Sequence, residues 1–356
     1  MKITVGGITF DPEAANSFQQ HTHHLLRKTA QLVTQWYSHQ PVFELTTSGS
    51  TGEPKTVFHH RKYLEWVAGE THRVMQLGGE EKVCCCLPLD KAGGFMMLVR
   101  SLVFDWDIEI LEPVANPADV WTLQPTFISM VPYQLEQILA MPLGSRKLDE
   151  IPHILLGGTS LPTSCIQYLS DRLSPGYIGY GMTETAGHIA LKTIGTDYET
   201  DPYVPFHGVQ FSLKDEFVTI DIPHFALRWV TRDIGLIEQG NLFLTGRSEE
   251  LLNSGGLKIT ATALESHLGQ FFKGKVGSAS FVVFGIPDKK FGQVIGVVFE
   301  GSKPDVADLE DCREYLTRMM DRRLIPNHWF AMDKIPRVNM KPDRRRLSQI
   351  FGAEAE

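Results

Sequence analysis

Cysteine, long apolar runs and an excess of charge are all scarce in this chain, and each shortage argues against a class of protein. The five cysteines form no Cys-x-x-Cys pair, so neither a zinc site nor a disulfide framework is expected. The longest apolar stretches, such as Phe95–Val99, are too short to span a bilayer. Lys and Arg number 34 against 42 Asp and Glu, and the net charge of −8 offers no general attraction for nucleic acid or anionic membranes.

The cysteines and the first residues also bear on the compartment. Cys84–Cys86 are consecutive, and they read as small apolar residues in a buried strand of a protein that lives in a reducing compartment. Met1–Phe18 carries one early Lys but no sustained apolar segment of the kind found in secretory leaders. We therefore expect a cytoplasmic protein without stable membrane insertion, and a homo-oligomer remains open.

The first 200 residues alternate strand-like and helix-like segments, which predicts an α/β domain with a largely parallel sheet whose ligands bind beyond the strand ends. One long helical region is expected before Pro41, from about residue 12 to 40. Predicted strands cover 42–46, 83–87, 108–111, 127–131, 154–156 and 177–180. Predicted helices cover about 61–77, 95–103, 132–139 and 163–173.

The pattern changes after Pro205. Short runs at 211–213, 217–222, 226–230, 236–237 and 242–244 predict a small antiparallel β subdomain at about 205–245. A compact α+β region follows, with strands at 258–259, 279–284 and 294–299, helices at 261–272 and 305–323, and a basic tail. We expect domains at 1–245 and 246–356, with the boundary near Thr245–Arg247.

The loop Thr46–Thr56 packs hydroxyls, glycines and Lys55 into what reads as a strand-to-helix turn. Glycines allow a phosphate to approach the backbone closely, and hydroxyls and N–H groups donate to it. An ordinary Ser/Gly-rich turn is the plain alternative. A Walker A loop is the nearer rival, but Pro54 stands where its second glycine belongs and has no N–H to donate.

Several motifs, in order, resemble those of the adenylate-forming superfamily of acyl-CoA synthetases, luciferases and peptide-synthetase adenylation domains. The first is the loop itself, and the last is the segment Pro336–Arg344, which resembles P-R-x-x-x-G-K-x-x-R. Between them lie Gly157–Pro162 (GGTSLP), Gly179–Glu184 (GYGMTE), Trp229–Asp233 (WVTRD), and Thr245–Arg247 followed by Ser254–Gly256 and Lys258. The resemblance covers about residues 42–344 and implies a large α/β domain with a mobile C-terminal domain.

This resemblance implies a two-step reaction. A carboxylate attacks the α-phosphate of ATP to give an acyl-adenylate and diphosphate, and the thiol of coenzyme A then displaces AMP. Lys341, Thr183, Glu184 and Lys258 are the implied catalytic residues: Lys341 for adenylation, Lys258 for the thioester step, and Glu184 also as the ligand of Mg²⁺. The implied nucleotide-binding residues are Thr47, Ser48, Gly49, Ser50, Thr51, Gly52, Lys55, Gly157, Gly158, Thr159, Tyr180, Gly181, Met182, Asp233 and Arg247.

Four of these residues also have a plainer interpretation. Lys341 fits a solvated lysine in a basic tail, Asp233 a turn cap, and Tyr180 a core aromatic at a strand end. Arg247 on residue type alone fits a surface ion pair with Glu249 or Glu250. Carboxylates and planar guanidinium groups are nevertheless the groups that hold ribose hydroxyls and phosphates.

The segment LPLDKAGG and the hinge GR-x-x-x-L-x-x-SGG resemble the short o-succinylbenzoate-CoA ligases of menaquinone biosynthesis. The resemblance implies a substrate pocket that includes Lys91, Gly93, Gly94 and His207, with Lys91 or His207 near a second carboxylate of the acid. The motifs also depart from the family pattern: Met340 and Arg232 replace glycines, and the phosphate loop begins unusually early. Another aryl- or acyl-CoA ligase, or a degenerate protein that binds nucleotide or acyl groups without catalysis, are the alternatives.

Overall fold

The computed structural model describes residues 1–47, 55–158, 161–195, 201–272, 281–338 and 341–352. They form two compact units. Unit 1 comprises Met1–Thr159, Cys165–Gln210 and Asp221–Leu227, and unit 2 comprises Ser160–Ser164, Phe211–Ile220 and Arg228–Glu356. The predicted boundary near residues 245–247 concerns the mobile hinge and stays a prediction. In the part of the chain described, no helix is long and apolar enough to cross a membrane.

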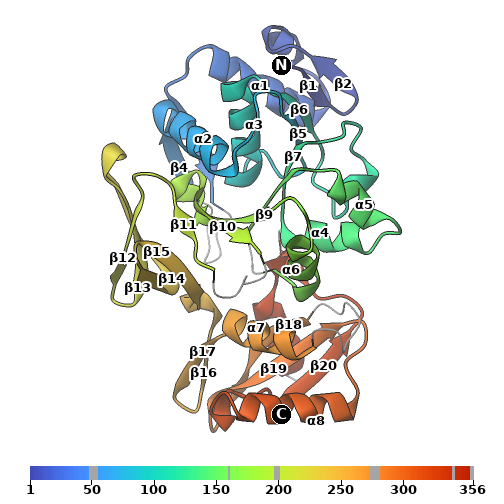
Figure 1. Ribbon diagram of the computed structural model, residues 1–356, viewed down its shortest axis with the longest axis vertical. Helices are drawn as coiled ribbons and strands as arrows, with labels where there is room; N and C mark the ends of the chain where they lie inside the picture. Colours follow the sequence, from blue (N-terminus) through green and yellow to red (C-terminus); the bar gives the residue numbers. More distant parts are fainter. Residues whose placement is uncertain (48–54, 159–160, 196–200, 273–280, 339–340, 353–356) are drawn as a thin grey trace. The chain divides into compact units, whose positions relative to one another are not determined.

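Unit 1 is built on a nine-stranded sheet with the order β11-β10-β9-β8-β7-β5-β6-β1-β2 (Figure 1). Its strands are β1 (Ile3–Val5), β2 (Ile8–Phe10), β5 (Lys82–Cys85), β6 (Asp107–Ile110), β7 (Phe127–Met130), β8 (His153–Gly157), β9 (Gly176–Met182), β10 (Gly187–Ile194) and β11 (Val204–Pro205). The six strands from β9 to β1 run parallel, whereas β2, β10 and β11 add antiparallel edges. The largely parallel sheet is as predicted.

The strand order reverses beside β5, and this switch point is where ligands bind in open α/β sheets. From β5 the chain passes through α3 (Ala92–Phe104) to β6 on one side, and from β7 it continues through α4 (Pro132–Leu139) and α5 (Gly144–Asp149) to β8 on the other. The helix α6 (Thr163–Ser170) then leads to β9. The helix α3 is buried along nearly its whole length and contacts β5, β6, β7 and β10.

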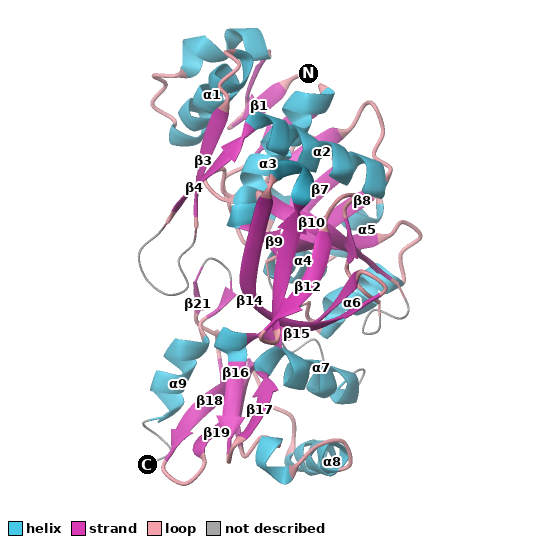
Figure 2. Ribbon diagram, turned by 90° about the vertical axis from the view of Figure 1, so that its left-hand side faces the viewer, coloured by secondary structure: helices cyan, strands magenta, loops and turns pink. Residues whose placement is uncertain are grey.

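The phosphate-loop region differs from the prediction. The loop does not lead from a strand into a helix, because β3 (Val42–Thr46) pairs antiparallel with β4 (Thr56–His60) and α2 (Arg61–Met75) begins only after β4. The predicted loop therefore joins the two strands of a hairpin (Figure 2). The polar residues of β4 hide the strand signal, since only His59 of its five side chains is buried.

Other elements needed correction at their ends. The long first helix is split into η1 (Pro12–Phe18) and α1 (His24–Tyr37), and the helix expected at 305–323 ends early as α8 (Val306–Thr317), before η6 (Arg322–Leu324). The runs at 226–230 and 236–237 belong to one strand, β14 (Leu227–Glu238). It lies in a four-stranded sheet with β12 (Gln210–Lys214), β13 (Phe217–Ile222) and β15 (Asn241–Arg247).

The C-terminal part of unit 2 is a sheet with helices on both faces. Its strands are β16 (Leu251–Ser254), β17 (Leu257–Thr260), β18 (Phe281–Asp288), β19 (Gly292–Glu300) and β20 (His328–Met332). One face packs against α7 (Ala261–Phe272) and α8. The other packs against α9 (Arg344–Gly352), which buries Leu347 and Phe351 against Phe284 of β18. The predicted basic tail is therefore an amphipathic helix, with its arginines at the start and its apolar residues inward.

Candidate functional site

The carboxyl ends of the parallel strands bring three predicted motifs to one edge of the unit 1 sheet. Leu87–Lys91 follows β5, and Thr183–Glu184 follows β9. Gly157 is the last residue of β8, and Gly158 comes directly after it. Strands β8 and β9 are direct neighbours, with Gly157 opposite Gly179. The order of the sheet therefore places the GGTSLP and GYGMTE motifs beside each other, although they are more than twenty residues apart in sequence.

Side-chain contacts anchor the base of the β3–β4 hairpin near the same edge. The N–H of Lys55 donates to Thr47 Oγ1 (3.0 Å), and the Thr47 N–H donates to the Lys55 carbonyl (2.9 Å). The Lys91 amine donates to the Thr46 carbonyl (3.4 Å), and His59 Nε2 lies 2.8 Å from the Thr183 carbonyl. The predicted loop residues Ser48–Gly52 lie outside the described residues, as does Thr159.

Glycines at this edge allow backbones to approach very closely. A Cβ on Gly181 would lie 1.9 Å from the Gly187 carbonyl oxygen, and one on Gly94 would lie 2.4 Å from the Pro88 carbonyl oxygen. Gly158 has a φ of +101°, which only glycine adopts readily. Any side chain at Gly181 or Gly94 would force the strand or the start of α3 to move.

The predicted catalytic pair Thr183 and Glu184 occupies a short 3₁₀ turn, η3 (Thr183–Thr185), directly after β9. The turn is fixed by Thr185, whose hydroxyl accepts from the Met182 N–H (2.9 Å), and whose carbonyl accepts from the Tyr63 hydroxyl (3.1 Å). Glu184 is partly exposed. Burial lowers the pKa of His59 beside it, against the opposing effects of the Thr183 carbonyl and the Glu184 charge.

Tyr180 is buried, with its ring 5.6 Å from that of Tyr203, so the plainer interpretation of a core aromatic describes it well. Gly93 is exposed, and Lys91 forms a 3.5 Å ion pair with Asp90. His207 is exposed and its backbone N–H donates to Glu70 (2.9 Å). Whether Lys91, Gly93, Gly94 and His207 contact substrate stays a prediction.

Arg100 is a candidate that the sequence analysis did not select. It lies in the middle of α3, is only 2% exposed, and has no ion pair with any carboxylate of the described residues. Its contacts are weak: Met97 Sδ at 3.9 Å and the ring nitrogens of His188 at 3.4 and 3.5 Å, while its Nε has no partner. Burial lowers the pKa of the Arg100 guanidinium to about 9.

The neighbours of Arg100 connect it to the strand-end motifs. His188 lies on β10 opposite Gly181 of β9, and its Nε2 lies 2.9 Å from the Thr71 hydroxyl of α2. Burial and the charge of Arg100 hold the pKa of His188 well below its ordinary value, so the ring is neutral. One signal in the sequence marks this site, namely a lone arginine inside the apolar run Phe95–Phe104.

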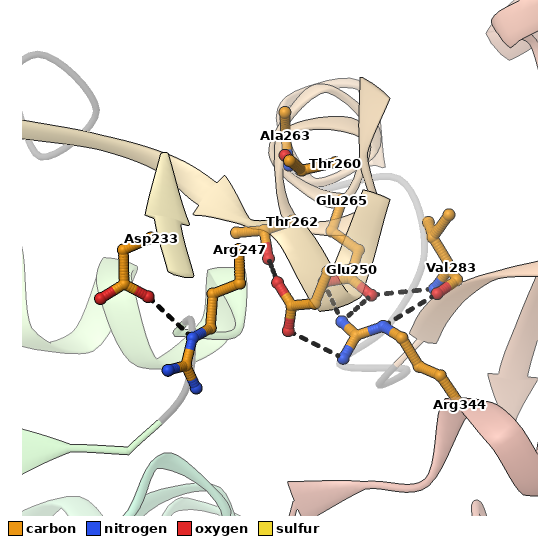
Figure 3. A network of polar contacts seen from close by, with 9 residues as sticks. All are labelled: Asp233, Arg247, Glu250, Thr260, Thr262, Ala263, Glu265, Val283 and Arg344. Carbon is orange, nitrogen blue, oxygen red and sulfur yellow. Dashed lines mark hydrogen bonds and ion pairs between the residues drawn. The ribbon is translucent and has the colours of Figure 1, made fainter. Parts of the chain in front are cut away.

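In unit 2, two of the predicted nucleotide-binding residues meet. Arg247 Nε donates to Asp233 Oδ1 at 2.7 Å, across the paired strands β15 and β14 (Figure 3). Asp233 is 7% exposed, and its N–H donates to the Thr231 hydroxyl (3.0 Å). The Arg247 side chain is 45% exposed. The pair combines a carboxylate and a guanidinium, the groups that hold ribose hydroxyls and phosphates, and its role in nucleotide binding stays a prediction.

Lys341 lies in the short strand β22 (Lys341–Pro342), opposite Val338 of β21 (Arg337–Val338). Burial first, and then the positive charge of Arg247, lower the pKa of the Lys341 amine, whereas the carboxylates of Glu250 and Glu249 act in the opposite direction. The interpretation of Lys341 as a fully solvated tail lysine is therefore wrong. Lys258 lies on β17 and is exposed.

Comparisons with known proteins agree with this arrangement. A family model described as AMP-binding enzyme matches residues 4–217. The 2-succinylbenzoate–CoA ligase of Listeria monocytogenes is 28% identical over 349 residues, which cover 90% of this chain and 73% of that protein. A 4-chlorobenzoate–CoA ligase of an Arthrobacter species is 25% identical over 358 residues, covering 88% and 67%.

A solved structure has a similar fold over nearly its full length. It is an acyl-CoA synthetase (AMP-forming)/AMP-acid ligase II-like protein from Dyadobacter fermentans, with 27% identity and a TM-score of 0.62. The match covers 96% of this chain and 99% of that one.

Proposed function

This chain belongs to the AMP-binding enzyme family, and we propose that it is an AMP-forming acid–CoA ligase whose acid carries a second carboxylate, as 2-succinylbenzoate does. The named relatives support the ligase reaction, and the Listeria relative supports this acid. The observation that carries the choice of acid is the buried guanidinium of Arg100, which contacts no carboxylate of the described residues.

The reaction balances in two steps. In the first, a carboxylate oxygen of the acid attacks the α-phosphorus of ATP, an O–P bond forms, and the bond to the β-phosphate oxygen breaks to release diphosphate. In the second, the thiolate of coenzyme A attacks the acyl carbon, a C–S bond forms, and AMP leaves with the electron pair of the broken C–O bond. Anionic charge develops in both steps, and cations such as Lys341 stabilise it.

A buried cation without a counter-ion is costly, and proteins rarely keep one unless something else satisfies it. The guanidinium of Arg100 lies within 3.5 Å of His188, on the strand next to the GYGMTE motif. A second carboxylate of the acid would pair with its planar fork and raise its pKa toward the ordinary value. Neutral His188, whose ring is held by the Thr71 hydroxyl, contacts the guanidinium without supplying a counter-charge.

Mg²⁺ fits the residues present. Magnesium is usually bound by one or two carboxylates together with the phosphates of the substrate, and Glu184 is a partly exposed carboxylate directly after β9. Groups of three or more potential protein ligands are absent from the described residues, so we propose that Glu184 and ATP hold the ion together. When bound, the ion would neutralise phosphate charge.

A ligase for another aromatic acid is the second candidate, because the 4-chlorobenzoate–CoA ligase matches this chain nearly as well. That acid has a single carboxylate and gives Arg100 no counter-ion. A degenerate protein without catalysis is the third, and the Asp233–Arg247 pair and the buried amine of Lys341 speak against it. The cytoplasmic location, predicted from the cysteines and the N-terminal residues, stays a prediction.

A panel of acids tests the proposal. Diphosphate release is measured with ATP and Mg²⁺, with and without coenzyme A, for 2-succinylbenzoate, benzoate, 4-chlorobenzoate and each of the two monomethyl esters of 2-succinylbenzoate. We expect the highest kcat/KM for 2-succinylbenzoate, no release with the ester of the reacting carboxylate, and a marked loss with the other ester, which keeps the reacting carboxylate but removes the second charge. Faster turnover of the single-charge acids would favour the second candidate, and silence with every acid would favour the third.

A further inference from the structure

Two arginines flank the hairpin that carries Lys341, and both are held by carboxylates. Arg337 at the start of β21 donates to Glu300 (2.9 Å). Arg344, three residues after Lys341, donates through Nη2 to both oxygens of Glu265 (2.9 Å each) and through Nε to the Val283 carbonyl (3.0 Å). The Lys341 strand is therefore fixed to α7 and β18 from its C-terminal side.

Arg344 also reaches the segment that follows Arg247. Its Nη1 donates to Glu250 Oε1 at 3.3 Å, and the other Glu250 oxygen accepts from the Thr262 hydroxyl (2.6 Å) (Figure 3). Glu250 lies in the short turn η5 (Ser248–Glu250) between β15 and β16. The guanidinium of Arg344, three residues after Lys341, thus contacts both α7 and the turn η5, which directly follows Arg247.

The network around Arg344 is well satisfied. Burial opposes the charge of Arg344, but the carboxylates of Glu265 and Glu250 outweigh it and raise the pKa of the guanidinium. Glu265 Oε1 also accepts from the Val283 N–H (2.9 Å). Removal of Arg344 would leave the largely buried Glu265 without its cation, and would free Glu250 from one of its two partners.

We propose that Arg344 is a positioning residue for Lys341, acting through Glu265, which fixes the start of α9, and Glu250, which fixes the turn after Arg247. The inference rests on the proposed function, since it concerns the adenylation step that we assign to Lys341. Arg344 touches no reacting atom in this scheme. It sets the distance from Lys341 to Arg247 and Glu250, whose charges act on the amine.

This role predicts an asymmetry between the two half-reactions. Adenylation depends on Lys341, whereas the thioester step is assigned to the exposed face of β17 around Lys258, which has no contact with Arg344 in the described residues. A displaced catalytic group lowers the chemical rate more than it lowers ground-state binding. Loss of Arg344 should therefore reduce kcat for adenylation and leave most of the thioester step intact.

The test compares Arg344→Gln, Arg344→Lys and Glu250→Gln with the control Arg345→Gln, which removes one charge from an exposed position of the same helix. Adenylation is followed by diphosphate release with 2-succinylbenzoate and ATP. The thioester step is followed separately with preformed acyl-adenylate and coenzyme A. Thermal unfolding of each variant shows whether it is folded.

We expect Arg344→Gln to lower kcat for adenylation about 10- to 100-fold, with KM for ATP and the thioester rate changed less than about 3-fold. Arg344→Lys should rescue little, because the ammonium group of lysine lacks the planar fork that contacts both oxygens of Glu265 and also reaches Glu250. The control should match the wild type. If Arg344→Gln fails to fold, Glu250→Gln carries the test, since it keeps the Arg344–Glu265 contact and should still slow adenylation several-fold.

The pH profile gives a readout that a merely structural role would not move. The charged groups that act on Lys341 are Arg247, Glu249 and Glu250. Glu250→Gln removes a carboxylate that raises the pKa of the amine, so the alkaline limb of the adenylation profile should move to lower pH. Equal loss of both half-reactions, or an unchanged kcat and profile, would overturn the inference. A wild-type protein inactive with every acid would instead overturn the proposed function.

Discussion

The two units hold their buried arginines in opposite ways. Arg344 of unit 2 contacts two carboxylates and a carbonyl, and its pKa is raised. Arg100 of unit 1 is more deeply buried, its contacts among the described residues are a thioether and a neutral ring, and its pKa is lowered to about 9. An arginine paired with carboxylates of its own unit fixes the elements that carry them, whereas a buried arginine without a carboxylate among the described residues can bind an anionic ligand. We therefore assign Arg344 to positioning and Arg100 to substrate binding.

The largest effect should come from the group that Arg344 positions. Lys341→Ala should lower the rate of diphosphate release about 10²- to 10³-fold, because a preorganised cation at the developing charge is lost. Its unfolding midpoint should stay close to that of the wild type, since the variant removes a partly buried charge and breaks no ion pair with any of the described residues. If the folded variant released diphosphate at the wild-type rate, Lys341 would not be catalytic. Arg344 would then have no catalytic group to position.

Arg100→Met should have the next largest effect and the opposite consequence for stability. We expect kcat/KM for 2-succinylbenzoate to fall about 100-fold, because a desolvated charge pair with the acid is lost. Benzoate should change much less. The unfolding midpoint should rise, since an unpaired buried charge is replaced by an apolar side chain of similar length.

The matched variant is Arg344→Met. Here the midpoint should fall, because Glu265 and Glu250 lose their cation. Differential scanning calorimetry of the two variants therefore gives shifts of opposite sign. If both midpoints fall, or if benzoate and 2-succinylbenzoate suffer equally from Arg100→Met, then Arg100 is a structural arginine and the distinction between the two disappears.

The sequence predicted the α/β sheet, the antiparallel subdomain and the order of the motifs, because alternating patterns and the residue types of the loops are local signals. It did not identify β4 or the helix of the tail. The residues Thr56–His60 carry too few apolar side chains, and the arginines at the start of α9 conceal its apolar face. Contacts between residues distant in sequence were also inaccessible, and for this reason Arg100 was not selected; Lys91 or His207 as the substrate cation stays a prediction.

The smallest effect concerns His188, whose ring faces Arg100 and the Thr71 hydroxyl. Burial and the charge of Arg100 lower its pKa in the folded protein, so below about pH 6.5 the unfolded chain binds a proton that the folded chain does not. Protonation of the unfolded chain therefore lowers the free energy of unfolding as the pH falls below that value, and has no effect above it. His188→Gln should therefore reduce the drop in unfolding midpoint between pH 7.5 and 5.5, by roughly 1 to 3 °C. In the Arg100→Met background the same substitution should have a smaller effect, because one cause of the lowered pKa is gone. If the wild type, the two single variants and the double variant all showed the same pH dependence of the unfolding midpoint, the charge of Arg100 would not lower the pKa of His188.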